Sequence, residues 1–458
     1  MNHAPLTTLA ALKVSGRAVA VPFSIALPDH SILLCDTILR FLPEKRIVLR
    51  GIHHQQTVLV KLFFDADNWQ KEINGFEKLQ HAGINTPTLL MQCALEQGGV
   101  CLFAFIDNAQ PLDVLWQQAD ETEKRGYLDK LLPCLQTLWQ HQLLQRDLHL
   151  GNFLLQTQED GSATLWLLDP ASCQHFSHPH EQQKNLALLL AQLPLADWDF
   201  ALQHLQGDAA INALAKQQWR QRLQHYLKKI LRDCTEVADL SPHSGLRILA
   251  QRRFLTPALR EQLKNPAALM QNAVILKNGN SAKVFRIEVD GKAFVVKQYL
   301  NKDWLRKLRR AFRPSRAARS WHYAHALAFA GVRVPHPVAL IEQKTGPLVT
   351  SAWFISEHCA DADLLTRWQA HAPTLEELHS LRAMFTALQA LHIHHGDMKA
   401  SNLLSDGKTL AVIDYDGVQH HRSAAALQRA LHKDTQRFLH NWPDNSALQQ
   451  QLTEYLAL

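Results

Sequence analysis

The stretch HHGDMKASNLL, His394–Leu404, decides which fold the sequence predicts. It sets three polar residues, Asp397, Lys399 and Asn402, at short intervals between apolar runs. Alone, an Asp in such a place is usually a helix cap or a turn former. Five residues ahead of an Asn, and followed by an apolar strand that ends in Asp414, it is typical of a catalytic loop.

A second stretch, QRDLHLGNFLL at Gln145–Leu155, has the same spacing in the first half of the chain. Asp147 again precedes an Asn, Asn152, by five residues, and another apolar strand follows and ends in Asp169. One position differs, because His149 stands two residues after the Asp where the later stretch has a Lys. The two halves therefore share one plan and differ in a detail of its chemistry.

Further landmarks repeat in the same order ahead of each stretch. Each half has a β-branched and aromatic segment with one Lys, which predicts a strand, and then the pattern Leu-x-x-Ala-Gly, a β-branched residue, x-x-Pro. These landmarks are VLVKLFF around Lys61 with residues 79–87, and FVVKQYL around Lys297 with residues 327–335. Ordered landmarks that repeat at similar spacing indicate an internal duplication.

Length and composition agree with two folded domains. The chain has 458 residues, which is long for one domain, and 47% of them are hydrophobic against 20% charged. A helical pattern over about 180–232 is broken at 235–245, where Ser-Pro and Ser-Gly are typical of turns. We therefore expect a first domain at 1–235, a linker region at 236–269 and a second domain at 270–458.

Charge and cysteine content favour a cytoplasmic protein. The net charge of +6 permits an anionic partner without naming one. The seven Cys include no Cys-x-x-Cys pair, which favours reduced thiols over a disulfide framework. No apolar run is long enough to cross a bilayer, and the first residues lack the pattern of a secretory signal, so a cytoplasmic location is expected.

The repeated Asp and Asn positions have a physical logic in phosphoryl transfer. The first Asp accepts or orients the proton of an attacking hydroxyl, while the Asn and the strand-borne Asp hold Mg²⁺ against the nucleotide phosphates. A Lys on an early strand neutralises the α- and β-phosphates, and a Glu on the next helix holds that Lys. The protein contributes mainly positioning and stabilisation of charge.

Both halves resemble protein-kinase-like domains. The second half more narrowly resembles the lipopolysaccharide kinase family, of the Kdo kinase, WaaP and InaA type, through HGDMKASNLL, VIDYDGVQHH and DTQRFLHNW. The resemblance covers most of residues 270–445 and, more loosely, about 40–235. It implies an α+β fold of two tandem protein-kinase-like domains, each with a β-rich N-lobe and a helical C-lobe. It also implies ATP and Mg²⁺ as cofactors, and phosphorylation of a heptose or Kdo hydroxyl of the lipopolysaccharide inner core at the inner membrane.

The resemblance assigns a role to each repeated residue. In the second half, Asp397 positions the acceptor hydroxyl and Lys399 supports the transferring phosphate. The other residues of this half are the metal ligands Asn402 and Asp414 and the nucleotide-binding residues Lys297 and Gly279. The first half has the catalytic residue Asp147, the metal ligands Asn152 and Asp169, and the nucleotide-binding residues Lys61 and Glu72.

Each half departs from the kinase pattern. Eleven residues before the repeated Gly, the first half has Glu72 but the second has Ser320, so Lys297 lacks its expected partner. An acid from elsewhere in space, a different way of holding this Lys, or weak activity would each account for that. In the first half, the stretch before Lys61 offers only Gly51 for a phosphate-binding loop.

Several interpretations stay open. Both halves could be active, one could be a pseudokinase, or one could bind substrate for the other. The second half is expected to be active, because its loop fits the family best. Lys399 keeps a protein Ser/Thr kinase as a rival, and Ser320 with the sparse glycines keeps a tandem pseudokinase scaffold as another.

A basic segment follows Lys297. Residues 302–319 hold eight Lys or Arg and one acid, with Trp304, Leu308 and Phe312 at every fourth position. This pattern predicts a helix with an apolar stripe and a cationic face. Such a helix is either an ordinary solvated surface or a site of peripheral contact with an anionic membrane or with substrate phosphates. No aromatic-interleaved RNA motif accompanies it, so no nucleic-acid partner is expected.

Overall fold

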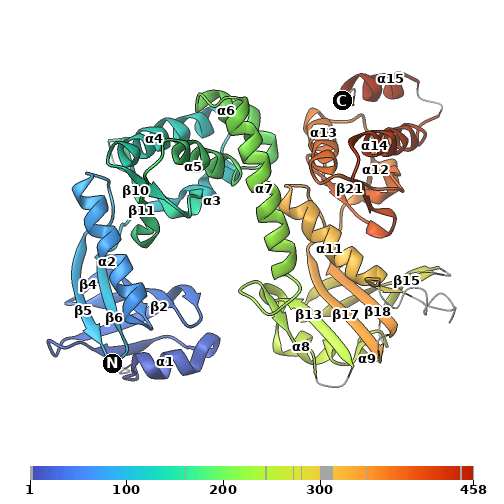
Figure 1. Cartoon of the computed structure of the whole chain (residues 1–458). Coiled ribbons are helices and arrows are strands. Elements are labelled where there is room, and N and C mark those ends of the chain that lie inside the picture. The colour runs from blue at the N-terminus through green and yellow to red at the C-terminus, as the bar shows by residue number, and fades with distance from the viewer. Residues whose placement is uncertain are drawn as a thin grey trace. The chain divides into compact units, whose positions relative to one another are not determined.

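The computed structural model describes residues 4–158, 160–242, 245–271, 273–279, 281–299, 313–346, 348–443 and 446–456. The chain forms two compact units. Unit 1 consists of Met1–Leu193 and Asp197–Trp219, and unit 2 consists of Pro194–Ala196 and Arg220–Leu458. The division falls inside helix α7, Ala209–Lys229 (Figure 1).

Unit 1 begins with helix α1 (Leu9–Ser15) and an antiparallel sheet in the order β1-β2-β3-β4-β6-β5. The strands are β1 (Phe23–Ala26), β2 (Ile32–Leu42), β3 (Arg46–His53), β4 (Gln56–Phe63), β5 (Leu89–Leu95) and β6 (Gly98–Ala104). Alternate residues of β3 are buried, which is the period of two that a half-buried strand requires. His54 and Gln55 join β3 to β4 with φ angles of 47° and 65°, as a two-residue hairpin turn requires.

Helix α2, Ala66–His81, packs against this sheet and carries Glu72. It begins after Asp65, whose side chain accepts a hydrogen bond from the amide of Asn68 at 2.7 Å and so caps the helix. Its buried apolar residues recur at helical spacing and are Ile73, Phe76 and Leu79. The buried face therefore turns Glu72 toward the strand that holds Lys61.

The rest of unit 1 is mainly helical. Its helices are α3 (Leu112–Gln118), α4 (Glu121–Gln140), α5 (His180–Leu190), α6 (Trp198–His204) and the first part of α7. Two small sheets, β7-β9-β10 and β8-β11, accompany them. Their strands are β7 (Ala109–Pro111), β8 (Leu143–Gln145), β9 (Phe153–Thr157), β10 (Ala163–Leu167) and β11 (Cys173–His175). The candidate loop of Asp147 and Asn152 connects β8 to β9.

Unit 2 has an antiparallel sheet in the order β12-β13-β17-β18-β16-β15-β14. Its strands are β12 (Val237–Asp239), β13 (Leu246–Gln251), β14 (Val274–Asn278), β15 (Ala282–Val289), β16 (Lys292–Tyr299), β17 (Pro337–Thr345) and β18 (Leu348–Glu357). Lys297 lies on β16, opposite Val284 of β15 and Phe354 of β18.

Residues 236–269 are part of unit 2 rather than a linker. Strands β12 and β13 extend the sheet beyond β17, and helices α8 (Pro257–Leu263) and α9 (Pro266–Leu269) pack on its apolar core. The residues that suggested a boundary lie between two paired strands, β12 and β13. Turn-forming residues mark a loop, but they do not reveal whether the strands on either side pair with each other.

The remainder of unit 2 is mainly helical. Its helices are α11 (Arg316–Phe329), α12 (Leu364–Ala370), α13 (Leu375–Ala390), α14 (Ala424–Leu439) and α15 (Ser446–Tyr455). Two small sheets have the orders β19-β21-β22 and β20-β23. Their strands are β19 (Ala362–Asp363), β20 (Ile393–His394), β21 (Leu403–Ser405), β22 (Leu410–Val412) and β23 (Gln419–His420).

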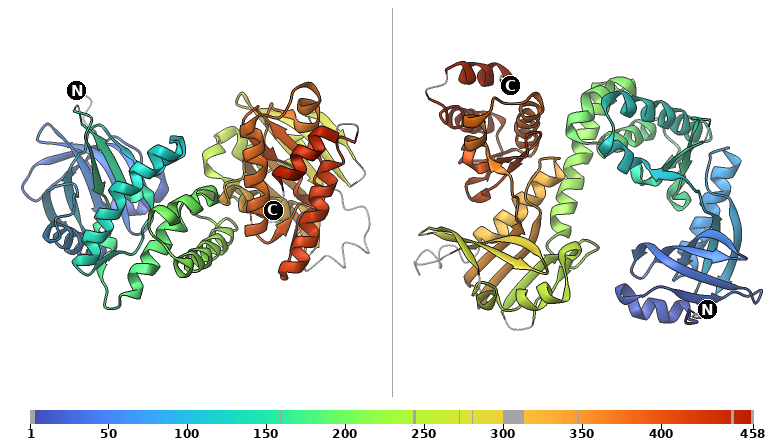
Figure 2. Two further views of the ribbon diagram at one scale, coloured as in Figure 1. Left: turned by 90° about the horizontal axis from the view of Figure 1, so that it is seen from above. Right: turned by 180° about the vertical axis from the view of Figure 1, so that it is seen from behind.

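The two units repeat one strand order. The order β2-β3-β4-β6-β5 in unit 1 matches β14-β15-β16-β18-β17 in unit 2, and the small sheets match in the same way. In each unit the large sheet lies at one end and most helices lie at the other (Figures 1 and 2). The expected α+β fold is confirmed, and the matching strand orders agree with a duplication.

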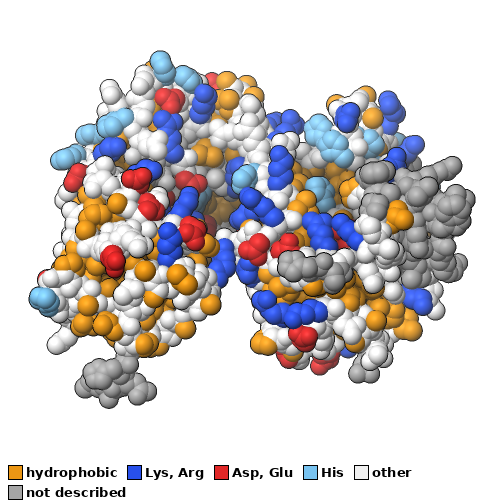
Figure 3. Space-filling model, turned by 60° about the horizontal axis from the view of Figure 1, so that its bottom comes forward, with side chains coloured by type: hydrophobic (Ala, Val, Ile, Leu, Met, Phe, Trp, Pro, Cys, Tyr) orange, Lys and Arg blue, Asp and Glu red, His pale blue; other side chains and the backbone are white. Residues whose placement is uncertain are grey.

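Two further observations bear on the sequence expectations. All seven cysteines are free thiols. In the part of the chain that the structure describes, no helix combines the length and the apolarity needed to cross a membrane. The face drawn in Figure 3 mixes Lys and Arg with Asp and Glu side chains in each unit.

Candidate active site

The central cation of unit 2 is Lys297 of β16. Its amino group donates a hydrogen bond to Asp414 Oδ1 at 2.6 Å and lies 2.8 Å from Asp416 Oδ2. Burial alone would raise the pKa of Asp414, but the charge and hydrogen bond of Lys297 outweigh it and hold that pKa below its ordinary value. Two landmarks that are 117 residues apart in sequence therefore meet.

Asp416 supplies the carboxylate that Ser320 cannot. It accepts a hydrogen bond from the hydroxyl of Tyr299 at 2.8 Å, and its Oδ2 lies 2.5 Å from the guanidinium of Arg316 at the start of α11. Together with its contact to the β16 lysine, Asp416 balances two cations. Of the three explanations for the missing helix Glu, the structure shows the first, an acid that comes from another segment.

Ser320 is buried on α11 and supports Asp416 through Tyr299. The two hydroxyl oxygens lie 2.8 Å apart. The single hydroxyl proton of Tyr299 is directed to Asp416, so Ser320 donates its own proton to the phenolic oxygen. Burial and the charge of Asp416 raise the pKa of Tyr299, which keeps the phenol protonated as a donor.

The stretch His394–Leu404 connects β20 to β21 and holds Asp397. The side-chain amide of Asn402 donates to the main-chain oxygen of Asp397 at 2.8 Å and to its carboxylate at 3.3 Å. The same carboxylate lies 3.2 Å from Lys399 Nζ and 2.6 Å from Arg437 Nη2 of α14. An amide and two cations therefore orient the carboxylate, while 33% of the Asp397 side chain stays exposed.

The buried part of this loop is held by His395 and Asp434. Asp434 on α14 accepts hydrogen bonds from the amides of His395 at 2.6 Å and Gly396 at 3.0 Å. His395 Nε2 donates to the carbonyl of Ile413 at 3.1 Å. Burial lowers the pKa of His395 and raises that of Asp434. Gly396 has a φ of 79°, and a Cβ there would lie 2.5 Å from the carbonyl oxygen of Gly417, so this turn requires glycine.

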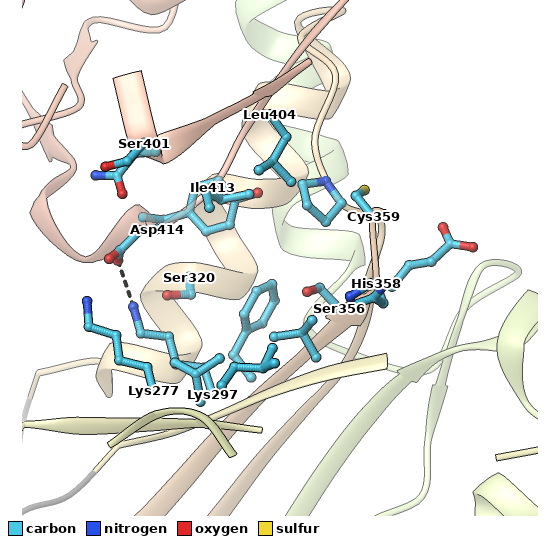
Figure 4. A pocket seen from close by; sticks show the side chains of 18 of the residues that line it. Lys277, Lys297, Ser320, Ser356, His358, Cys359, Ser401, Leu404, Ile413 and Asp414 are labelled. Atoms are coloured by element: carbon cyan, nitrogen blue, oxygen red, sulfur yellow. Dashed lines mark hydrogen bonds and ion pairs between the residues drawn. The ribbon is translucent and has the colours of Figure 1, made fainter. Parts of the chain in front are cut away.

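A cavity of about 460 Å³ opens beside these residues. Lys277 of β14 and Lys297 point their amino groups toward the end where Asp414 lies (Figure 4). Apolar side chains line the cavity elsewhere, among them Val284, Val295, Phe354, Leu404 and Ile413. An apolar slot with cations at one end suits a nucleotide, whose base is flat and whose phosphates are anionic.

In unit 1 the central cation is Lys61 of β4. It forms an ion pair with Glu72 of α2 and donates a hydrogen bond to the carbonyl of Leu168 at 2.9 Å. Glu72 is fully buried, and Lys61 is buried as well. The structure thus brings together the two residues that the sequence predicted as partners.

Arg46, at the start of β3, is a second cation beside this ion pair. Its guanidinium is 3.5 Å from Glu72 Oε2 and 3.2 Å from Asp169 Oδ1. Ser172 donates to the second oxygen of Asp169 at 2.8 Å. Burial alone would raise the pKa of Asp169, but Arg46 and Lys61 outweigh it and hold that pKa below its ordinary value.

The loop of unit 1 is held differently from its counterpart. Asn152 donates to the main-chain oxygen of Asp147 at 2.7 Å, as in unit 2. His149 Nε2 lies 3.7 Å from the Asp147 carboxylate, whose side chain is 60% exposed. Gln145 takes the place of the buried histidine, and Asn185 of α5 donates to its carbonyl at 2.8 Å. Burial lowers the pKa of His149, so this position favours a neutral ring.

A cavity of about 560 Å³ opens beside the unit 1 residues. Arg40, Arg46 and Lys61 supply its cations. Its apolar lining includes Val48, Leu59, Leu154 and Leu168. This cavity therefore has the same general character as that of unit 2, with one more cationic residue.

Gly51 does not belong to a phosphate-binding loop. It lies within β3, paired with Val58 and Cys35, and a Cβ there would come within 2.6 Å of the carbonyl oxygen of Leu34. The matching strand orders place the loop between β2 and β3 at residues 43–45, which contain no glycine. In unit 2 the same position, between β14 and β15, holds Gly279, whose amide donates to the carbonyl of Ala282 at 3.1 Å.

Both units match one known protein family. The sequence model of the lipopolysaccharide kinase (Kdo/WaaP) family matches residues 51–226 and 267–456. The chain belongs to this family. Both matched segments contain a candidate loop and its strand-borne Lys and Asp.

Individual relatives within the Kdo/WaaP family are more distant. Two 3-deoxy-D-manno-octulosonic acid kinases of Vibrio vulnificus, from strains YJ016 and CMCP6, are 30% and 31% identical over 109 and 104 residues. These segments cover 23% and 22% of this chain but only 46% and 44% of those proteins, so the chain spans less than half the length of these curated relatives. A solved structure, WaaP in complex with acyl carrier protein, is 19% identical with a TM-score of 0.29 and covers 43% of this chain and 93% of that one.

Unit 2 has donors that fit a magnesium ion. Asn402 and Asp414 both line the cavity, and the amide of Ile413 donates to the carbonyl of Asn402 at 2.9 Å. Amide and carboxylate oxygens are the hard donors that Mg²⁺ prefers. The side chain of Asp414 is 34% exposed, so a hydrated cation can reach it.

Unit 1 has the same two residue types but a different environment. Asn152 and Asp169 line one cavity, and the amide of Leu168 donates to the carbonyl of Asn152 at 2.9 Å. However, Arg46 and Ser172 engage both carboxylate oxygens of Asp169, whose side chain is only 11% exposed. In this arrangement the residues of unit 1 do not fit a magnesium ion.

The basic segment is only partly within the described residues. Residues 302–312, and with them the whole predicted apolar stripe, lie outside the described part of the chain. Of the remaining basic residues, Arg316 pairs with Asp416 and Arg319 donates to the carbonyl of Val418 at 2.6 Å. These two arginines stabilise unit 2 internally and do not form part of a free cationic face.

Five site residues escaped the sequence reasoning: Arg46, Lys277, Arg316, Asp416 and Arg437. Asp416 carried a usable signal, because it is a second acid two residues after the strand-borne Asp414. Arg316 stands one helical turn before Ser320 and so shares its face. Lys277 and Arg46 could be recognised as site residues only from the order of the strands in each sheet, which a single sequence does not supply.

Proposed function

We propose that this chain is an ATP-dependent kinase that phosphorylates a sugar hydroxyl of the lipopolysaccharide inner core, with unit 2 carrying out the reaction. The proposal rests on one observation, the grouping of Lys297, Asn402 and Asp414 around one cavity with Asp397 on the adjoining loop. Membership of the Kdo/WaaP family supports the reaction class. The similarity to the Vibrio 3-deoxy-D-manno-octulosonic acid kinases supports a sugar acid as the acceptor.

In the proposed reaction, Asp397 accepts the proton of the acceptor hydroxyl. The hydroxyl oxygen attacks the γ-phosphorus of ATP, a new O–P bond forms, the bond from this phosphorus to the β,γ-bridging oxygen breaks, and ADP leaves. Asn402 fixes the carboxylate through its amide, and Lys399 neutralises charge on the phosphoryl group in transfer. A positioned general base of this kind contributes about 10²–10⁴-fold to the rate.

The nucleotide end of the site uses the two lysines of the sheet. Lys297 and Lys277 point to the same end of the cavity and would bind the α- and β-phosphates (Figure 4). Asp416 and Arg316 keep Lys297 in place by balancing its charge. A magnesium ion, when held by Asn402 and Asp414, would neutralise phosphate charge.

Within this proposal, Kdo suits the site better than heptose. Kdo is 3-deoxy-D-manno-octulosonic acid and carries a carboxylate, whereas heptose is neutral. Lys399 and Arg437 flank Asp397 with side chains that are 46% and 49% exposed. Two accessible cations beside the candidate base are suited to bind an anionic sugar through charge-assisted hydrogen bonds.

The decisive experiment compares Asp397→Ala with Asp147→Ala in transfer of labelled phosphate from ATP. With a Kdo-terminated lipid acceptor, Asp397→Ala should lower the rate by about 10³-fold or more, because the general base is lost. Asp147→Ala should stay within about threefold of the wild type, since this residue lies in the other unit. Full activity in Asp397→Ala with an inactive Asp147→Ala would transfer the reaction to unit 1.

Parallel acceptors separate the rival functions in the same assay. A heptose-terminated core without exposed Kdo should accept little label, because it offers no carboxylate to Lys399 and Arg437. A mixed protein acceptor should also stay unlabelled. Transfer to protein alone would favour the Ser/Thr kinase, and failure of the wild type to bind or hydrolyse ATP would favour the pseudokinase scaffold.

A further inference from the structure

We infer that the cavity of unit 1 binds a nucleoside polyphosphate without a divalent cation, and that the guanidinium of Arg46 takes the place of the metal. Unit 1 would hold its ligand in this way whichever acceptor unit 2 phosphorylates.

Arg46 lies against Asp169, the candidate metal ligand of unit 1. Its guanidinium contacts Asp169 Oδ1 and Glu72 Oε2, and only 14% of its side chain is exposed. An arginine stays charged at any pH that a folded protein tolerates. A cation at Asp169 would therefore have to displace a permanent one and leave it buried with only the carboxylate of Glu72, which Lys61 already engages, and that is unfavourable.

In unit 2 the arginine of the cleft has a different partner. Arg316 pairs with Asp416, so the contact to the strand-borne Asp414 comes from Lys297 instead. The side chain of Asp414 is 34% exposed, against 11% for Asp169. One unit thus leaves its strand-borne carboxylate accessible to a hydrated ion, and the other covers it with a guanidinium.

The lining of the cavity identifies the chemical class of the ligand. Val48, Leu59 and Leu154 contribute apolar side chains that suit a purine base. Arg40 and Arg46 line the same cavity together with the central lysine. Guanidinium groups bind phosphate through paired hydrogen bonds, and fixed cations can neutralise a polyphosphate that elsewhere requires magnesium.

The chemical consequence is that unit 1 binds nucleotide but does not transfer its phosphate. Magnesium stabilises the charge that develops on the phosphates during transfer, and the Arg46 contact removes the ligand that would hold it. The Asp147 side chain is 60% exposed, and His149 Nε2 lies 3.7 Å from its carboxylate. The polyphosphate then serves to order unit 1 and is not consumed there.

The test uses the full chain with Lys297→Ala, which disables nucleotide binding in unit 2. ATP is titrated by calorimetry in EDTA and then in excess Mg²⁺. We expect one ATP per chain in EDTA, with an affinity that magnesium leaves unchanged or weakens. Adding Lys61→Ala should abolish this binding and so locate it in unit 1. Binding that requires Mg²⁺, or no binding in either buffer, would overturn the inference.

Two further variants separate the role of Arg46 from an effect on folding. Arg46→Met should weaken ATP binding in EDTA at least tenfold, whereas Arg50→Met, on the same strand and paired with Asp36 at the surface, should leave it unchanged. Asp169→Asn keeps the shape of the site and should change the affinity less than twofold in both buffers. A tenfold loss of Mg²⁺-dependent affinity in Asp169→Asn would instead identify a metal ligand.

The result of the ATP-binding experiment is independent of the result of the phosphate-transfer assay. Asp397 lies in unit 2, so the loss of activity in Asp397→Ala does not depend on what unit 1 binds. ATP binding in EDTA together with an inactive wild type would reject the proposed kinase and keep the metal-free site. An active wild type together with no ATP binding in EDTA would reject only the metal-free site.

Discussion

The ion-paired clusters around the two central lysines hold the same balance of charge but draw it from different segments. Each cluster contains one lysine, one arginine and two carboxylates. In unit 1 they are Lys61, Arg46, Glu72 and Asp169, and in unit 2 they are Lys297, Arg316, Asp416 and Asp414. The number of charges around the lysine is therefore the same in both units, while their positions along the chain differ.

Three matched positions differ together. Two residues after the central lysine, unit 1 has Phe63 and unit 2 has Tyr299. At the helix position, unit 1 has Glu72 and unit 2 has Ser320. Two residues after the strand-borne Asp, unit 1 has Ala171 and unit 2 has Asp416. The acid has moved from the helix to the loop after the strand. The tyrosine and serine hydroxyls then fill the space near the helix and orient the new acid. This comparison yields predictions that separate the two arrangements.

The largest expected effect is on stability. Glu72→Ala should lower the free energy of unfolding of unit 1 by about 3–5 kcal/mol, because it leaves buried Lys61 without its partner. Ser320→Ala is the matched control in unit 2 and should cost only about 1 kcal/mol, the contribution of one hydrogen bond. Urea unfolding of both variants measures the difference. Equal losses would mean that the helix position has the same role in both units.

A slightly smaller effect concerns catalysis. Asp416→Ala should lower kcat/KM for ATP by about 100-fold, since Lys297 loses an anchor and its amino group shifts from the phosphates. Combining it with Tyr299→Phe and Ser320→Glu recreates the arrangement of unit 1 and should recover most of the activity. Recovery of activity would show that the number of charges around the lysine matters more than the segment that supplies them. Full activity in Asp416→Ala alone would show that Asp414 suffices to hold the lysine.

The smallest effect concerns acid stability and is specific to unit 2. His325 on α11 is buried against the Tyr226 hydroxyl, and burial lowers its pKa to about 3. The folded pKa lies below the unfolded value of about 6.5, so the stability contribution is full above about pH 6.5 and declines as the pH falls toward 3. At pH 5 the loss should be about 2 kcal/mol.

Urea unfolding at pH 7 and pH 5 checks this pH dependence. His325→Gln should weaken it by the share that His325 contributes, because this position then no longer has to stay neutral in the core. Glu77→Gln is the matched control, since Glu77 occupies the equivalent position in unit 1 and is exposed. An unchanged pH dependence in His325→Gln would assign the acid sensitivity to another group.

Local features of the site were predictable from the sequence. Asp397 and Asn402 stand five residues apart, and a loop of that length places the amide on the main chain of the Asp. Asp147 and Asn152 repeat the contact in unit 1. The α+β fold and the repeated order of landmarks along the chain also follow from local patterns, because each Lys-bearing segment has strand composition and each apolar segment ends in an Asp.

Features that depend on contact across the cleft were not predictable. Asp416 and Arg316 are 100 residues apart in sequence, and nothing in their local surroundings indicates that they meet. Gly51 looked like a loop glycine, but its role is the close approach of a neighbouring strand. The segment 236–269 looked like a linker, because strand pairing depends on a partner strand, β17, about 90 residues later.

The relocated acid also constrains the order in which such a pair of clefts can diverge from one ancestor. A lineage that lost the helix acid before it gained Asp416 would pass through a protein whose cleft sets a lysine and an arginine against the strand-borne carboxylate alone, which is a destabilised intermediate. The loop acid therefore arose first or at the same time. Recombination between the two halves meets the same barrier. A crossover between helix and loop that joins Ser320 to Ala171 would give a cleft with one acid too few. The reverse crossover would join Glu72 to Asp416 and give a cleft with one acid too many. Linked positions of this kind keep duplicated halves distinct once they have separated.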